Sequence, residues 1–353
     1  MSTHRHSDGP GLLVLGCSHH TAGLDEREAL TLPQQAFDHA FYAKACGNGV
    51  LAEALVVATC NRLEVYAVTP ASADEARQRL EALLAPKVNL GTFQHRAYLK
   101  TGEQAAEHLF AVAAGLDSQI LGETEIFGQM KAAYAEATGA QATGAVLNRL
   151  FQRGFQAAKW ARTHTAISRG QVSLGNVAAE LARRVCGDLD QLSIILTGTG
   201  QVGAQTAQAL VSRGARQVFV SGRNIIKARE VAAEITGAAV IDFARVANTL
   251  RFADVLISCT SAPNSVFSRD AVAALRQQRP ERPLFMIDLA VPRDIDPDAG
   301  TLPDCYLFNL DDLSAIANEN LRERESEVRR ARKALSERAR RVWNELRERF
   351  DRG

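Results

Sequence analysis

Three polar residues and a thiol stand together where an apolar run is interrupted. Residues 55–66 read LVVATCNRLEVY, so Thr59, Cys60, Asn61 and Arg62 break a strand-like pattern. A cysteine attacks as its thiolate, whereas a free cysteine has a pKa of about 8.5. A guanidinium two residues away can lower that pKa or bind a substrate carboxylate. The alternative is an inert cysteine, because free cysteines are among the most buried residues.

A second chemistry-bearing segment is a glycine-rich turn between a strand-like run and a helical run. It reads Gly198-Thr199-Gly200-Gln201-Val202-Gly203, after residues 193–196 and before residues 204–211. In this setting the first glycine makes a tight turn, the second lets the backbone approach a pyrophosphate, and the third lets helix and strand pack closely. The N–H groups that open the helix then bind phosphate. The pattern predicts a dinucleotide-binding loop.

The end of the next strand-like run discriminates between two nicotinamide cofactors. A site that prefers NAD usually carries an acidic residue there, which binds the ribose 2′-hydroxyl. This chain has Ser221, Arg223 and Asn224 instead. Because arginine suits a 2′-phosphate by charge and by bidentate geometry, we expect NADPH as the cofactor. The alternative is a Rossmann domain that has lost its cofactor.

A cysteine nucleophile combined with NADPH indicates a reaction class. The thiolate attacks an activated acyl group, a thioester forms, and hydride converts the thioester to an aldehyde. The cysteine and the nucleotide loop lie far apart in the sequence, so we expect them in different domains.

The chain resembles the glutamyl-tRNA reductase family from residue 11 to about residue 320, in the family's order. The matching stretches are ATCNRLEVY at 58–66, HLFAVAAGLDSQILGE at 108–123, GQMKAAY at 128–134, TGTGQVG at 197–203, IDLAVPRDIDP at 287–297 and CYLFNLDDL at 305–313. The resemblance implies NADPH-dependent reduction of glutamyl-tRNA(Glu) to glutamate-1-semialdehyde, the first step of C5-pathway tetrapyrrole and haem biosynthesis.

The resemblance also implies roles for individual residues. Cys60 falls on the nucleophile that forms the glutamyl thioester, His108 on a catalytically important histidine, and Arg62 on the position that binds the glutamyl carboxylate. The other substrate-binding positions are Thr59, Asn61, Ser118, Glu123, Thr124, Glu125 and Gln129. The cofactor-binding positions are Gly198, Thr199, Gly200, Gln201, Val202, Gly203, Ser221, Arg223 and Asn224. From the residues alone, a lone helical histidine is more often structural, and Ser118 could simply cap a helix end.

Two positions depart from the family pattern close to the expected site. Leu63 replaces the usual threonine after the arginine, and Glu125 places a carboxylate where an amide is expected. The loop Ser18–Gly23 also lacks the family's proline. These departures leave open a diverged relative that reduces another aminoacyl-tRNA or a carrier-bound acyl group. A non-catalytic regulator that binds NADP is the third hypothesis.

These motifs require a multidomain α/β fold. We expect an N-terminal α+β catalytic domain, a helical connector, a Rossmann NADP-binding domain and a long C-terminal helix, at residues 11–143, 144–190, 191–308 and 309–353. The strand-like runs of the first domain are Leu12–Leu15, Ala54–Ala58 and Leu63–Ala67. Those of the Rossmann domain are LSIILTG, QVFVSG, AAVID, DVLISC, LFMIDL and CYLFNL.

The C-terminal segment has no proline or glycine from Asp311 to Phe350, which predicts one long helix. Its apolar residues Leu335, Ala339, Val342 and Leu346 form a narrow seam suited to a partner helix; the alternative is a solvated, charged helix. Residues 321–353 hold twelve Lys and Arg against seven Asp and Glu, so this surface could contact RNA phosphates. We interpret it as a truncated form of the family's dimerisation region and expect a homodimer.

Composition limits the remaining classes of protein. The 353 residues carry a formal net charge of +1, so no global basic field indicates nucleic acid. No apolar run approaches the ~18 residues that span a bilayer, and the N-terminus has no hydrophobic signal core. Six scattered cysteines without a CxxC pair favour no metal site, no disulfide framework and a reducing cytoplasm. The expected partners are glutamyl-tRNA(Glu) and an aminotransferase that receives glutamate-1-semialdehyde, with no membrane.

Overall fold

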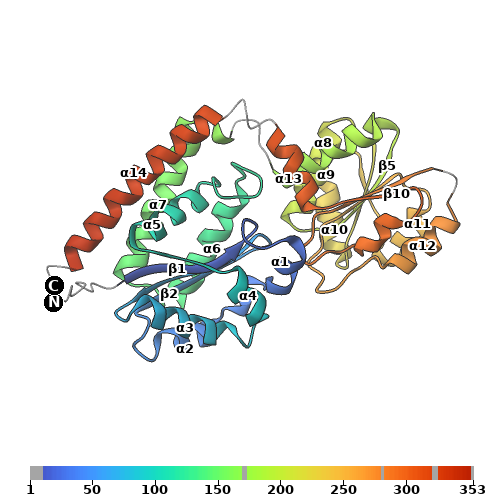
Figure 1. Cartoon of the computed structure of the whole chain (residues 1–353). Coiled ribbons are helices and arrows are strands. Elements are labelled where there is room, and N and C mark those ends of the chain that lie inside the picture. The colour runs from blue at the N-terminus through green and yellow to red at the C-terminus, as the bar shows by residue number, and fades with distance from the viewer. Residues whose placement is uncertain (1–10, 169–172, 280–281, 320–324, 351–353) are drawn as a thin grey trace. The chain divides into compact units, whose positions relative to one another are not determined.

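The structure is a computed structural model that describes residues 11–168, 173–279, 282–319 and 325–350 (Figure 1). The chain divides into two compact units. One unit contains the described residues of 1–169 and 322–353, and the other contains those of 170–321.

The first unit is built on a four-stranded antiparallel sheet. Its strands β1 (Gly11–Ser18), β2 (Glu53–Ala58), β3 (Arg62–Thr69) and β4 (Tyr98–Thr101) lie in the order β2-β3-β1-β4. The predicted strands are therefore confirmed, and each is longer than its apolar run. The helices are α1 (Leu24–Leu30), α2 (His39–Cys46), α3 (Ala73–Leu84), α4 (Leu90–Arg96), α5 (Gly102–Ala113), α6 (Glu125–Gly139), α7 (Ala145–His164) and α14 (Glu325–Phe350), with short 3₁₀ turns η1 (Gln34–Ala36) and η2 (Ala166–Ser168).

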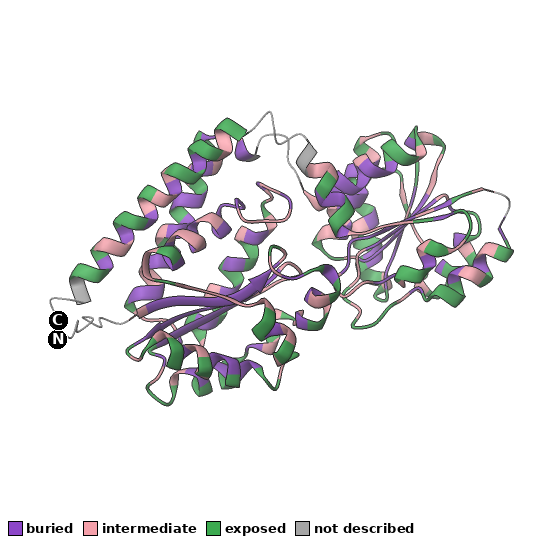
Figure 2. Ribbon diagram, in the orientation of Figure 1, coloured by how far each residue is buried: buried purple, intermediate pink, exposed green. Residues whose placement is uncertain are grey.

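Both faces of this sheet are covered, with α5 and α7 on one side and α2 and α3 on the other (Figure 1). Every residue of the central strand β3 is therefore buried (Figure 2). Successive side chains of a strand point to opposite faces. Glu64 and Tyr66 face the α5–α7 layer, where they contact His108 and Phe151, so Leu63 faces the other side.

Helix α14 completes the first unit. It runs for 26 residues and packs against α5 and α7 of the same chain. The four predicted seam residues are all buried, which excludes a fully solvated helix. Arg340 at its surface pairs with Glu103 of α5 at 2.7 Å. The partner that the apolar seam required is thus found within this chain.

The second unit is a six-stranded parallel sheet. Its strands β5 (Ser193–Thr197), β6 (Gln217–Ser221), β7 (Ala238–Val240), β8 (Val255–Ser258), β9 (Leu284–Asp288) and β10 (Cys305–Phe308) lie in the order β10-β9-β8-β5-β6-β7. The helices are α8 (Leu174–Cys186), α9 (Gln201–Ser212), α10 (Ile225–Ala233), α11 (Val246–Leu250), α12 (Arg269–Gln277) and α13 (Leu310–Glu319), with 3₁₀ turns η3 (Leu189–Gln191), η4 (Phe243–Arg245) and η5 (Pro297–Thr301). This strand order is that of the Rossmann fold, as the alternating sequence pattern predicted.

The two units divide the chain differently from the predicted domain boundaries. The segment 144–190, interpreted as a connector, contains α7 in the first unit and α8 in the second, because α7 packs on α5 and α8 packs on α9. The segment 309–353 likewise contains α13 in the second unit and α14 in the first. The structure therefore shows two helices where one was predicted, and residues 320–324 between them lie outside the described ranges.

Among the helices described here, none has the length and apolar character to cross a bilayer.

Candidate active site

Cys60 stands on a tight turn that joins β2 to β3. The Thr59 N–H donates to the Arg62 carbonyl at 2.9 Å, which closes the turn. The Thr59 hydroxyl oxygen accepts hydrogen bonds from the Asn61 and Arg62 N–H groups, each at 3.2 Å. These contacts fix the turn and leave Cys60 half-buried at its tip. The three residues around the thiol therefore shape its backbone.

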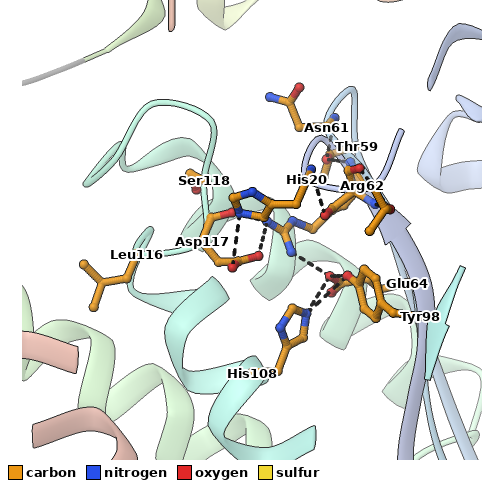
Figure 3. A network of polar contacts seen from close by, with 12 residues as sticks. His20, Thr59, Asn61, Arg62, Glu64, Tyr98, His108, Leu116, Asp117 and Ser118 are labelled. Carbon is orange, nitrogen blue, oxygen red and sulfur yellow. Dashed lines mark hydrogen bonds and ion pairs between the residues drawn. The ribbon is translucent and has the colours of Figure 1, made fainter. Parts of the chain in front are cut away.

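Arg62 does not lie open to a ligand but is the centre of a buried network (Figure 3). Its Nη1 donates to Glu64 Oε1 at 2.6 Å, and its Nη2 donates to Asp117 Oδ2 at 3.1 Å and to the Asp117 carbonyl at 2.5 Å. Burial alone would lower the pKa of Arg62, but Glu64, Tyr98 and Asp117 raise it, so the guanidinium stays charged. The two carboxylate partners differ in exposure, at 0% for the Glu64 side chain and 22% for that of Asp117.

His108 is oriented by the same network. Its Nε2 lies 2.8 Å from Glu64 Oε1 and 3.3 Å from the Tyr98 hydroxyl. The Tyr66 hydroxyl donates to Glu64 Oε2 at 2.7 Å. Burial raises the pKa of Glu64, but the charges of Arg62 and His108 outweigh burial and hold that pKa well below its usual range. An ionised Glu64 accepts the Nε2 proton of His108, which fixes the ring and its tautomer.

Arg27 is a cation of this site that the sequence did not indicate. It lies on α1, is only 4% exposed, and donates from Nη1 to the side-chain oxygens of Asn61 and Gln119, the latter at 3.2 Å. Burial and the carboxylates of Glu125 and Glu123 together raise the pKa of the Cys60 thiol to about 11, although Arg27 acts to lower it. An arginine on a short polar helix carries no local signal of this role.

The segment before α6 brings three of the predicted substrate-binding residues together. Glu123 accepts hydrogen bonds from the Ser118 hydroxyl at 3.0 Å, the Glu125 N–H at 2.6 Å and the Ile126 N–H at 3.2 Å. Burial raises the pKa of Glu123 despite these donors. Burial and the neighbouring Glu123 raise the pKa of Glu125 to about 7. Two carboxyl groups thus share this region with the thiol.

The structure separates the remaining predicted positions from this group. Thr124 and Gln129 are exposed at the start of α6. Leu63, the family departure on β3, is 3% exposed and belongs to the hydrophobic core on the far side of the strand. Its apolar side chain therefore does not face the Arg62 network. Alternation along the strand turns Leu63 away from Arg62, so this departure gives no reason to expect a different substrate.

The loop between β1 and α1 adds two histidines to the network. His20 Nε2 lies 3.4 Å from Asp117 Oδ1, and the His19 ring packs on the His20 ring with centroids 3.9 Å apart. Burial and the neighbouring His20 and Arg62 together lower the pKa of the His19 imidazole to about 3. His19 is therefore neutral, and the sequence marks this loop only by its missing proline.

In the second unit, the glycine loop has the backbone that a dinucleotide loop requires. Gly198 has φ +116°, and a Cβ there would lie 2.4 Å from the Cys259 carbonyl oxygen. A Cβ on Gly203 would lie 2.1 Å from the Gly198 carbonyl oxygen, whereas one on Gly200 would meet nothing within 4 Å. Gly200 caps α9, which begins with Gln201 and Val202. The open side of Gly200 leaves room for a phosphate at the helix N-terminus.

The end of β6 lies beside this loop. A Cβ on Gly222 would lie 2.7 Å from Thr199 Cγ2, so the two turns are in contact. Ser221 is fully buried, and its Oγ has no hydrogen-bond partner among the described residues. Arg223 is exposed, whereas the Asn224 side chain is engaged as the N-cap of α10, accepting from Ile226 N at 3.0 Å. The unpaired Ser221 hydroxyl, the exposed Arg223 side chain and the open side of Gly200 together fit a pyridine nucleotide.

Comparison with known proteins gives relatives over almost the whole chain. A "Glutamyl-tRNA reductase" of Syntrophus aciditrophicus is 39% identical over 93% of this chain and 78% of its own length. One from Akkermansia muciniphila is 37% identical over 90% of this chain and 93% of its own length. The solved structure "Glutamyl-tRNA Reductase from Methanopyrus kandleri" is 33% identical, covers 96% of this chain and 80% of its own, and has a TM-score of 0.52.

The two units also match separate domain families. Residues 15–165 match "Glutamyl-tRNAGlu reductase, N-terminal domain", and residues 180–316 match "Shikimate / quinate 5-dehydrogenase". A Rossmann unit of this type, joined to an α+β unit with a cysteine at its site, defines an oxidoreductase that uses a pyridine nucleotide. With relatives of this identity and coverage, the chain belongs to the glutamyl-tRNA reductase family.

Proposed function

We propose that this protein reduces glutamyl-tRNA(Glu) to glutamate-1-semialdehyde with NADPH, through a thioester on Cys60. The observation that carries the proposal is the Cys60 turn, which leads directly into the buried network of Arg62, Glu64 and His108. This turn lies in the unit that matches the family's N-terminal domain. The reaction opens the C5 pathway of tetrapyrrole and haem biosynthesis.

The proposed chemistry has two stages. The Cys60 sulfur attacks the ester carbonyl carbon, a carbon–sulfur bond forms, and the carbon–oxygen bond to the tRNA ribose breaks. We assign the proton taken up by the leaving ribose oxygen to His108, because histidine is the commonest general acid in enzymes and Glu64 fixes its ring. When bound, NADPH supplies the hydride that replaces sulfur on that carbon, which releases the aldehyde and returns the thiolate.

We propose that Arg62 binds the glutamyl carboxylate of the substrate, which would take the place that the Asp117 carboxylate occupies in this structure. Both of its ion-pair partners are carboxylates, and the Asp117 side chain is the more exposed of the two. A glutamyl carboxylate that replaced Asp117 would keep the charge on Arg62 balanced and would leave the Glu64 pair intact. The bidentate geometry of a guanidinium suits this exchange. Thr59 and Asn61 then shape the turn, and Ser118, Glu123, Thr124, Glu125 and Gln129 remain candidates for further substrate contacts.

The preference for NADPH over NADH rests on the end of β6. The exposed Arg223 suits a 2′-phosphate, and the buried Ser221 hydroxyl lacks a partner among the residues described. Residues Gly198 to Gly203 would hold the pyrophosphate. We also propose a homodimer, direct binding of tRNA, and transfer of the aldehyde to an aminotransferase.

The test is to trap the thioester. Wild-type protein is incubated with glutamyl-tRNA(Glu) without NADPH, and the intact mass and the Cys60 peptide are then measured. The expected result is a glutamyl adduct on Cys60 that disappears when NADPH is added, with aldehyde released. Cys60→Ser should form no such adduct while binding NADPH as wild type does. A wild-type protein that never gains the adduct refutes the proposed function.

A further inference from the structure

One buried carboxylate in the second unit, that of Asp294, accepts three hydrogen bonds. Asp294 is completely buried, and its Oδ2 accepts from the Ser258 hydroxyl at 2.6 Å and from the Thr260 N–H at 2.7 Å. Its Oδ1 accepts from the Thr260 hydroxyl at 2.5 Å. Burying a charge is unfavourable unless hydrogen bonds replace the water, and here three donors do so.

The backbone carbonyl of Asp294 accepts hydrogen bonds from a second segment of the chain, residues 265–267. The Asp294 carbonyl accepts from the N–H groups of Val266 and Phe267, at 2.7 and 2.9 Å, and from the Ser265 hydroxyl at 3.1 Å. Asp294 is therefore bound to both ends of the segment 259–267. Between those ends the tip residues 263–265 are exposed. Asp294 thus fixes a surface loop at its two roots.

This loop borders the place where the sheet changes direction. The strand order reverses between β5 and β8, which end at the paired residues Thr197 and Ser258. Their hydroxyl oxygens lie 2.7 Å apart, so the hydrogen bonds of Asp294 continue across the switch point. Cys259 Sγ contacts the Thr197 carbonyl oxygen at 3.2 Å, beside the glycine loop. In open α/β sheets, ligands bind outside the carboxyl ends of the strands at this point.

The position of the loop 259–267 indicates which half of a bound dinucleotide it would border. Strand β6, which carries Ser221 and Arg223, pairs with one side of β5, and β8 pairs with the other. A nucleotide whose adenosine 2′-phosphate lies at the β6 end and whose pyrophosphate lies on the glycine loop must place its other half at the β8 end. The segment 259–267 borders that half.

We propose that Asp294 is a positioning residue for the nicotinamide half of the cofactor, acting through the loop 259–267 that it holds. The inference rests on the proposed function, because it requires NADPH in this unit. It assigns Asp294 no contact with the cofactor. It predicts that loss of this carboxylate weakens binding of the nicotinamide end and spares the adenosine end.

The test compares two ligands on the full-length protein. Dissociation constants for NADPH and for 2′,5′-ADP, which lacks the nicotinamide half, are measured by calorimetry on wild type and Asp294→Asn. We expect NADPH to bind about tenfold more weakly to the variant, while 2′,5′-ADP binds within about twofold of wild type. Asp296→Asn is the matched control, because its carboxylate caps the surface turn η5 through the Asp298 N–H.

Thr260→Val provides a second variant, which loses one hydroxyl contact to Asp294 but keeps the buried carboxylate. Its dissociation constant for NADPH should rise by about threefold, and that for 2′,5′-ADP should not change. If Asp294→Asn does not fold, this variant alone tests the inference. Equal loss of both ligands, or no loss of NADPH binding, overturns the inference while wild type still binds NADPH. Wild-type protein that binds neither ligand overturns the proposed cofactor instead, and with it this inference.

Discussion

The thiol of Cys60 lies in an environment that opposes its ionisation, and Glu125 is the residue on which this can be tested. Burial, Glu125 and Glu123 together raise the pKa of the thiol to about 11. At pH 8 that pKa leaves about one thiolate in a thousand, whereas a free cysteine of pKa ~8.5 is about a quarter ionised. Glu125→Gln removes one of the two charges responsible and keeps the shape of the side chain.

The expected size of the effect follows from the charge removed. Two unit charges about 4 Å apart interact by about 1 kcal/mol in water and by about 4 kcal/mol near a protein surface, and we take the lower figure for the half-buried thiol. That energy corresponds to about a fivefold increase in thiolate. Because thiolate is the form that reacts, Cys60 of the variant should be alkylated by iodoacetamide about five times faster than wild type at pH 8.5.

The pH dependence makes the prediction specific to Glu125. Burial and the neighbouring Glu123 raise the pKa of Glu125 to about 7, so its charge is present above that pH and absent below it. The ratio of variant to wild-type alkylation rates should therefore be close to one at pH 5.5 and rise through pH 7 to its plateau. Alkylation is followed at the Cys60 peptide by mass spectrometry, because the chain has six cysteines. Asp74→Asn, an exposed carboxylate on α3, is the control and should leave the rate unchanged.

Two results would refute this reasoning. A ratio that stays at one at every pH would mean that the Glu125 charge does not reach the thiol. A ratio of about five that does not change with pH would mean that Glu125 keeps its charge at pH 5.5, which contradicts its raised pKa.

Three further predictions test the network, the nucleotide loop and the partner. Glu64→Gln should lower the free energy of unfolding, measured by urea titration, by about 3 kcal/mol at pH 7, because it leaves Arg62 and His108 without their buried carboxylate. The pKa of Glu64 is lower in the folded state than in the unfolded state, so its stabilising contribution is present above the unfolded value of ~4.3. The difference between variant and wild type should therefore shrink as pH falls below 4. Gly200→Ala should leave the melting temperature unchanged and weaken NADPH binding at least about tenfold. Gly203→Ala should weaken NADPH binding and also lower the melting temperature, because its Cβ would lie 2.1 Å from a carbonyl oxygen. Identical behaviour of the two variants would contradict this. Binding of tRNA should weaken steeply from 50 to 200 mM salt, as phosphate contacts release counterions, and a flat titration would argue against direct contact.

Much of the fold could be predicted from the sequence, because its signals are local. Each strand of the Rossmann unit appears as a short apolar run, and the glycine loop requires particular backbone conformations at Gly198 and Gly203. Cys60 and Arg62 likewise mark a turn that interrupts a strand. These features depend on neighbours within a few residues, so one sequence suffices to locate them.

The contacts of the site could not be predicted in this way. Arg27 meets Asn61 across 34 positions, and Arg62 meets Asp117 across 55. Whether a guanidinium is free for a substrate or paired with a carboxylate depends on the packing of α1 and of the loop after α5, which leaves no periodicity in the sequence. The partner of the α14 seam was unpredictable for the same reason, since a suitable face does not say which chain covers it.

The structure also separates the two family departures that suggested a different substrate. Leu63 lies in the apolar core on the side of β3 opposite to Arg62, so its effect is on packing and not on the site. Glu125 lies close enough to Cys60 to raise the pKa of its thiol. Of these two departures, Glu125 is therefore the one that bears on acyl specificity, and its carboxyl group is partly protonated at neutral pH. A protonated carboxyl group can donate a hydrogen bond as an amide can, so Glu125 resembles the expected amide more closely below pH 7 than above it.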